Sequence, residues 1–307
     1  MEQLAQQLFN ALQWGSYYAL IALGYSMVYS ILMLFNFAHG DVFMVATYIG
    51  YFVAVGLLGL AAVQILPLSN LAVFVLTLIL TMFLASFVGI GVELVAYRPL
   101  RDAPRASAAI TGLMVGIFME TAVLATLGAS RKDFPLLIPP ITFTIGPVHV
   151  TNLKLLTLAM AFGLMFLLHL FISRTKIGMA MRAMSFDYAV VPLMGIPMNT
   201  IIVFTFALGS ALAGAAGILF GMAYPVLDPY MGVLIGWKAF VAAILGGRGS
   251  IFGAVVGGFL LGFIEILVAA TLPSTMRDLI AYSIVLLILT FRPYGLFGEE
   301  YSARLRL

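Results

Sequence analysis

The chain has no cysteine and very little charge. Only 9% of its 307 residues are charged, and 63% are hydrophobic. Without cysteine it can form no disulfide and no thiolate nucleophile or metal ligand. Soluble domains carry about 25% charged residues, so a chain this poor in charge cannot cover its surface for contact with water. We therefore expect most of the outer surface to face the lipid bilayer.

Catalytic and nucleotide-binding motifs are also missing. The sequence contains no Walker A motif, no G-x-S-x-G and no H-E-x-x-H, and its three histidines lie far apart. The glycine-rich stretch 246–250 (GGRGS) lacks the spacing of a phosphate loop and predicts a tight turn instead. A membrane enzyme is therefore poorly supported, no cofactor or metal is predicted, and any ATP hydrolysis must be performed by another chain.

Long hydrophobic runs are what the sequence does contain. A helix needs roughly 20 apolar residues to cross a bilayer, and its backbone polar groups must be paired within the helix. The sequence thus predicts an all-α, polytopic transmembrane bundle of about eight or nine spans in a single domain, residues 1–307. The segments are 8–34, 42–60, 71–96, 108–127, 153–172, 200–222, the short 232–245, 251–271 and 279–291.

The basic residues indicate topology rather than a nucleic-acid surface. The net charge is +3 and the pI about 9.1, but the arginines and lysines are dispersed over short loops. They concentrate in three places, near 98–105, 174–182 and 292–306, separated by two and then four predicted spans. By the positive-inside rule all three face the cytoplasm. The first 97 residues have no lysine or arginine, so charge does not orient the N-terminus. They also lack a basic signal-peptide start, so we expect the first hydrophobic segment to be retained.

The longest cytosolic connection is residues 173–199. Ile177, Met181 and Met184 recur there at helical spacing among charged residues. This pattern is typical of a short amphipathic helix at the membrane surface. A basic loop that only fixes topology fits the residues equally well.

Two sets of polar residues interrupt the hydrophobic segments. In the stretch NFAHGD (36–41), Asp41 suits a helix cap, Asn36 a helix end, and His39 either a buried interface or a pathway. Buried acids are costly in lipid and suggest function. Glu93 is expected to pair with a nearby arginine, and Lys238 with Glu120 or Glu265. The candidates for a translocation pathway are Asn36, His39, Asp41, Glu120 and Glu265.

Small residues recur every four positions late in the chain. Such stripes allow close helix packing in lipid, and packing inside the bundle is favoured over a subunit interface. The residues are Gly209, Ala213, Gly217, Gly221, Gly253 and Gly257.

Several of these motifs, in order, resemble the permease subunits of bacterial branched-chain amino acid ABC importers. The resemblance covers nearly the whole chain. It is carried by GSYYALIALGYSMVY (15–29), NFAHGD (36–41), YRPLR (97–101), FALGSALAGAAGILFG (206–221), KAFVAAILGGRGSIFGAVVGGFLLGFIE (238–265) and RPYGLFG (292–298).

The resemblance implies an inner-membrane permease, not an enzyme, that works by alternating access. It implies a second permease subunit, two cytosolic ATPase subunits and a periplasmic substrate-binding protein as partners. The loop 173–199 would be the ATPase-coupling segment, with Arg182, Ala183, Asp187 and Gly195 in it. Two alternatives remain: an ion-coupled secondary transporter using Glu120 or Glu265, and a permease of the same type for urea or short amides.

Overall fold

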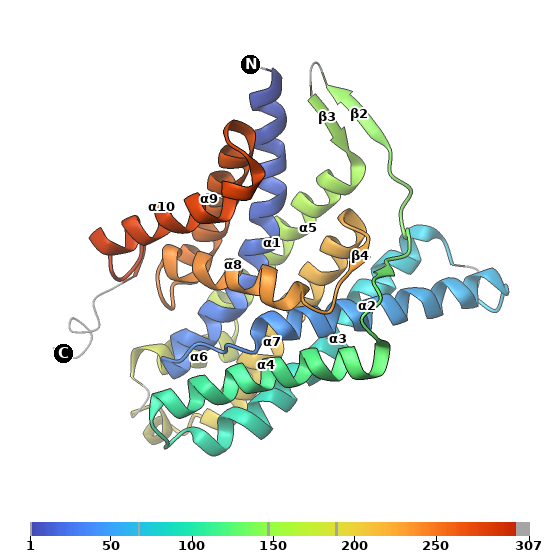
Figure 1. Ribbon diagram of the computed structural model, residues 1–307. Coiled ribbons are helices and arrows are strands. Elements are labelled where there is room, and N and C mark those ends of the chain that lie inside the picture. Colours follow the sequence, from blue (N-terminus) through green and yellow to red (C-terminus); the bar gives the residue numbers. More distant parts are fainter. Residues whose placement is uncertain (1, 67, 146–147, 188–189, 299–307) are drawn as a thin grey trace.

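The computed structural model describes residues 2–66, 68–145, 148–187 and 190–298. Helices make up most of this part of the chain (Figure 1). The main helices are α1 (Glu2–Leu32), α2 (His39–Ala62), α3 (Asn70–Val92), α4 (Arg105–Leu127), α5 (Asn152–Arg174), α6 (Lys176–Phe186), α7 (Met198–Ala223), α8 (Met231–Gly246), α9 (Ile251–Thr271) and α10 (Arg277–Phe291). Arg304 and Arg306, used in the topology argument, lie outside the described residues.

All nine predicted hydrophobic segments are helical. Among the described residues, seven helices are long and apolar enough to cross a membrane: α1, α2, α3 with its extension, α4, α5, α7 and α9. The other two are shorter, with 16 residues in α8 and 15 in α10. At 1.5 Å per residue α8 is about 24 Å long, less than the roughly 30 Å of a hydrocarbon core. Helix α8, which contains the segment predicted to be short, is therefore shorter than the thickness of the hydrocarbon core.

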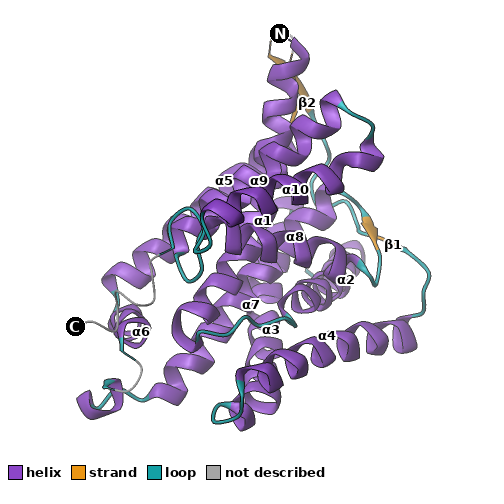
Figure 2. Cartoon of the chain, turned by 60° about the vertical axis from the view of Figure 1, so that its left-hand side comes forward, coloured by secondary structure: helices purple, strands orange, loops and turns teal. Residues whose placement is uncertain are grey.

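Helix α1 runs through the interior of the bundle. In both views α5, α7, α8 and α9 surround it (Figures 1 and 2). From Tyr17 to Leu23 its side chains are fully buried. This agrees with its sequence, because α1 is the least apolar of the candidate spans among the described residues, and polar side chains in a membrane protein form hydrogen bonds between helices. Next to this group, α2, α3 and α4 run across the direction of α1, and α3 packs on α7.

Within the described part of the chain, four short strands lie in connections between helices, which the sequence did not predict. Strands β2 (Thr142–Ile145) and β3 (Val148–Thr151) form an antiparallel hairpin before α5. Strand β1 (Lys132–Asp133) pairs with β4 (Val226–Leu227), which precedes α8. The second pair ties the 128–152 connection to the end of α7, and Phe134 is buried beside Gly221 there.

Helix α3 continues into a different helical geometry. Residues Glu93–Tyr97 form a π-helix and Arg98–Leu100 a 3₁₀ turn. Pro99 contributes to this ending because it lacks an N–H group and restricts the residue before it. The chain therefore leaves the membrane-crossing part of α3 at the YRPLR stretch, and then enters α4.

Candidate functional site

The NFAHGD stretch forms the entry to α2, with a geometry that partly differs from the prediction. Helix α2 already begins at His39, and no side chain caps it. The prediction that Asp41 caps this helix is therefore wrong, because Asp41 lies inside the first turn. Asn36 closes the turn instead, since its Oδ1 accepts a hydrogen bond from the N–H of Ala38 at 3.2 Å. The left-handed residue of this connection is Met33, with φ 53°, whereas Gly40 is helical.

Gly40 serves close packing between α2 and α8. A Cβ added to Gly40 would lie 2.7 Å from the carbonyl oxygen of Gly232 and 2.9 Å from the Cα of Gly236. Added carbons at Gly232 and Gly236 would in turn contact Gly40 or Asp41. Three glycines at one crossing let the two backbones touch, so the Asp41 carboxylate is held directly against the first turn of α8.

A small cavity lies where α2, α4 and α8 meet. Its volume is about 50 Å³, and both Asp41 and Glu120 line it. Asp41 is 7% exposed, and its Oδ1 has no hydrogen-bond partner among the described residues. Glu120 is half-buried on α4. In both views α2 lies between α8 and α4 (Figures 1 and 2).

His39 and Asn36 do not line this cavity. His39 is 1% exposed, and its ring contacts that of Tyr25 edge to face at 4.9 Å. Its Nε2 faces Gly24 of α1, where an added Cβ would collide with it. Of the five pathway candidates, the structure thus brings Asp41 and Glu120 together and turns His39 toward the interior.

Glu265 belongs to a separate buried cluster. Its Oε1 lies 2.9 Å from Nζ of Lys238, and its Oε2 accepts a hydrogen bond from Tyr18 at 2.8 Å. The same Lys238 ammonium lies 2.7 Å from Oδ1 of Asp278, at the start of α10. The predicted pairing of Lys238 with one of the membrane acids is confirmed for Glu265. This cluster joins α1, α8, α9 and α10.

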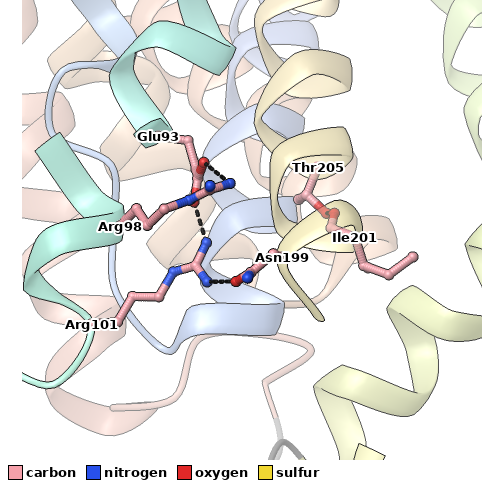
Figure 3. Close-up of polar contacts among 6 residues, drawn as sticks. All are labelled: Glu93, Arg98, Arg101, Asn199, Ile201 and Thr205. Carbon is pink, nitrogen blue, oxygen red and sulfur yellow. Dashed lines mark hydrogen bonds and ion pairs between the residues drawn. The ribbon is translucent and has the colours of Figure 1, made fainter. Parts of the chain in front are cut away.

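A second charged cluster joins the α3–α4 connection to the start of α7. Glu93 is fully buried and pairs with Arg98 at 3.2 Å and with Arg101 (Figure 3). Arg101 also donates a hydrogen bond to Oδ1 of Asn199, and Figure 3 shows it bridging the two acceptors. The pairing of Glu93 with arginine was predicted. The link to Asn199 was not, because the two residues lie 98 positions apart.

The 173–199 connection contains α6 and a 3₁₀ turn, η3 (Val191–Met194). Thr175 caps α6 by accepting a hydrogen bond from the N–H of Gly178 at 3.0 Å. The apolar face predicted from sequence packs inward, with Met181 and Met184 buried and Ile177 half-buried. In η3, Val191 is buried, whereas Leu193 is 86% and Met194 70% exposed.

The four residues singled out in this connection have different positions. Arg182 donates to the carbonyl oxygen of Ile172, at the end of α5. Ala183 is half-buried on α6. Asp187 accepts a hydrogen bond from the N–H of Val190 at 3.2 Å. Gly195 has φ +73°, a conformation that favours glycine, and it turns the chain from η3 toward α7.

The small residues of α7 and α9 lie at helix crossings. A Cβ on Gly209 would be 3.2 Å from the Cα of Gly24 in α1, and one on Gly217 would collide with Thr47 of α2. Ala213 is fully buried. Gly221 lies against Phe134, while Gly253 and Gly257 lie against the end of α8. All six sit at contacts inside this one chain.

The GGRGS and RPYGLFG stretches form one unit. Gly247 and Gly249 have φ +127° and +80°, as a tight turn requires, and Ser250 then caps α9. Backbone N–H groups of Leu296 and Phe297 donate to the carbonyls of Leu245 and Gly246 at 2.9 Å. Arg248 donates to the carbonyl of Pro293 at 2.8 Å. The C-terminal motif thus packs onto the end of α8.

These features define a class of protein. Apolar side chains such as Phe118 and Val95 are 69% and 80% exposed on the spans, which suits contact with lipid, while Glu93, Lys238 and Glu265 form ion pairs in the interior. The chain is a multi-pass helical membrane protein.

The family follows from comparison with known proteins. Residues 7–289 match the family model described as branched-chain amino acid transport system / permease component. The chain is 43% identical to the high-affinity branched-chain amino acid transport system permease protein BraD of Pseudomonas aeruginosa, covering 96% of this chain and 95% of that one. It is 36% identical to LivH of Escherichia coli, which has the same descriptive name, at the same coverage. The chain belongs to this family of transport permeases and is therefore a multi-pass protein of the inner membrane, not an enzyme.

Proposed function

We propose that this chain is one of two permease subunits of an importer for branched-chain amino acids. Two cytosolic ATPase subunits supply the energy, and a periplasmic binding protein delivers the substrate. The substrate class is supported by the names of relatives such as BraD and LivH, which match along nearly their whole length. As a component of a transport system, the chain works together with further subunits.

The coupling to ATP hydrolysis is inferred from the exposed apolar side chains of the α6–η3 segment. Leu193 is 86% exposed on it, Met194 70%, and Phe186, at the end of α6, also 70%. Two basic residues lie at the other end of the helix from Phe186, since Arg174 ends α5 and Lys176 begins α6. Exposed apolar patches are typical of protein interfaces. We assign this surface, within residues 173–199, to docking on an ATPase subunit.

The connections of α6 make it suitable for passing on motion. Its inner face packs on the bundle through Met181 and Met184. Arg182 attaches it to the end of α5, and the Arg101–Asn199 hydrogen bond attaches the chain after η3 to the α3–α4 connection. A displacement of α6 would therefore move α5, α7 and the α3–α4 pair as rigid elements.

An ion-coupled secondary transporter is the second candidate. It requires an acid in the membrane that is free to bind and release the coupling ion. Glu265 is a poor choice for that role, because it is held by Lys238 and Tyr18. Glu120 remains as the acid on which this alternative depends, since it forms no ion pair among the described residues.

The test is reconstitution of the complete importer in liposomes. We expect ATP hydrolysis that rises when a leucine-loaded binding protein is added, together with leucine uptake. A panel containing leucine, isoleucine, valine, urea and acetamide defines the substrate class. Uptake by this chain alone, without ATP and driven by a proton or sodium gradient, would overturn the proposal in favour of the secondary transporter.

A further inference from the structure

The cavity between α2, α4 and α8 has acidic side chains in its lining and no basic ones. Two of its lining side chains are carboxylic acids, Asp41 and Glu120, and none is lysine, arginine or histidine. Both acids lie in membrane-spanning helices. Two uncompensated acids in such a place are costly. Their arrangement is therefore suited to a positively charged group that enters from outside the chain.

The second observation is the state of Asp41 itself. Its side chain is more than nine-tenths buried, and its Oδ1 has no partner. Oδ1 points at α8, because a Cβ built on Gly232 would lie 2.7 Å from it, and Gly232 lines the cavity. Buried polar atoms are paired in the great majority of cases, so this oxygen lacks a hydrogen-bond donor that a bound group could supply.

The remaining wall of the cavity is aromatic. Phe37, Trp237 and Phe240 line it and contact one another, with ring centroids 5.3–6.1 Å apart. Tyr25 extends the cluster by an edge contact with Phe240 at 5.6 Å. Faces of aromatic rings attract organic cations. Small metal ions require several oxygen ligands instead, and within the described ranges no group of three or more His, Asp or Glu is placed to hold one.

From these observations we infer that the Asp41–Glu120 cavity is the subsite in this permease for the ammonium group of the transported amino acid. The inference rests on the proposed function. Asp41 accepts hydrogen bonds from the ammonium through Oδ1, Glu120 adds a second negative charge, and the rings of Trp237 and Phe240 cover the cation.

The size of the cavity agrees with a subsite for the head group. A volume of about 50 Å³ holds a few groups the size of a water molecule, each of which needs about 10–15 Å³. That is room for an ammonium group rather than for a whole branched amino acid. The side chain of the substrate would then lie toward α4, whose Leu113 and Ile117 also line the cavity and are exposed.

Trp237 provides a direct readout of binding. The chain has two tryptophans, so a Trp14→Phe background leaves Trp237 as its single fluorophore of this kind. The chain is purified in detergent, and its emission is titrated with leucine, with 2-hydroxy-4-methylpentanoate, which has a hydroxyl in place of the ammonium, and with sodium chloride. We expect a saturable change with leucine alone. An equal response to the hydroxy acid, or to sodium without leucine, would overturn the inference.

The Asp41→Asn variant tests the residue. Loss of a hydrogen bond to a charged group corresponds to roughly a tenfold to hundredfold weaker response to leucine. Asp133→Asn, in strand β1 outside the cavity, is the matched control and should bind like the parent. An unchanged affinity in Asp41→Asn would contradict the inference. If this variant fails to fold, the comparison of leucine with the hydroxy acid in the parent chain decides.

Uptake measurements separate this inference from the proposed function. If the complete importer shows binding-protein-stimulated ATP hydrolysis and leucine uptake, and Asp41→Asn loses uptake while keeping the stimulation, both stand. If the variant transports normally, the subsite is refuted and the importer function stands. If the parent importer shows neither stimulated hydrolysis nor uptake, the proposed function fails, whatever the fluorescence shows.

Discussion

The ammonium of Lys238 lies 2.9 Å from Oε1 of Glu265, in an ion pair that joins α8 to α9 inside the bundle. Both side chains are buried, and Tyr18 of α1 completes the acid's surroundings. Helix α8 has only 16 residues, so contact with the lipid along its length contributes less to its position than it does for a longer helix. The ion pair fixes its position relative to longer neighbours.

Breaking this pair should destabilise the bundle more than removing it entirely. Lys238→Met leaves Glu265 buried without its cation, which costs about 3–5 kcal/mol. The double variant Lys238→Met with Glu265→Gln should recover much of that loss, because no buried charge is left unpaired and the exposed Asp278 keeps its pair with Arg277. Thermal unfolding in detergent measures both, with Lys132→Met outside the cluster as control. A double variant no more stable than Lys238→Met would show that Glu265 does not depend on Lys238.

The hydrogen bond from Arg101 to Asn199 should affect coupling more than stability. Asn199→Ala leaves the Glu93–Arg98 pair in place, so a change in stability below about 1 kcal/mol is expected for this exposed residue. Coupling between distant sites carried by such contacts is about 0.5–2 kcal/mol, or roughly two- to thirtyfold. We expect fewer leucine molecules imported per ATP hydrolysed, measured in liposomes.

The adjacent Thr200→Ala is the matched control for Asn199→Ala. Thr200 is also exposed at the start of α7. Equal losses of transport per ATP in the two variants would refute a specific role for the Arg101–Asn199 contact.

The exposed residues of η3 should be needed for assembly with the ATPase subunits. Leu193→Asp places a charge in the apolar centre of the proposed interface, and loss of an anchor there typically costs about 2 kcal/mol or more. Co-purification with the ATPase subunits should fall strongly while the chain still folds. Ile141→Asp is the control, because Ile141 is 54% exposed in the connection before α5. Unchanged co-purification of the ATPase subunits with the Leu193→Asp variant would contradict the assignment of the interface.

The glycine contact between α2 and α8 should tolerate no side chain. Gly236→Leu would force the larger residue against the Cα of Gly40, and overpacking of this kind costs about 1–3 kcal/mol. Gly163→Leu in α5 is the matched control, because nothing lies within 4 Å of a Cβ built there. The melting temperature should fall only in the first variant. A similar fall in both would indicate a general effect of leucine rather than this crossing.

Contacts within the site between residues far apart in the chain could not be predicted from sequence, because they depend on how the helices pack. Glu93 and the arginines of YRPLR are neighbours in the chain, so their pairing followed from proximity and charge. The Arg101–Asn199 contact depends on how α7 packs against α3, which local pattern does not encode. Asp41 was expected to cap α2, but the helix starts two residues earlier and leaves the carboxylate facing α8.

By itself the sequence determined the helical membrane class, the nine hydrophobic segments and the family, because hydrophobic run length and motif order are local properties of the chain. It also placed the amphipathic face of α6 correctly. The tertiary structure alone decided which polar residues meet: it put Glu265 with Lys238, Asp41 with Glu120, and His39 away from the cavity. These outcomes depend on helix rotation and crossing, which are set by contacts between segments far apart in the chain, such as the glycines of α2 and α8.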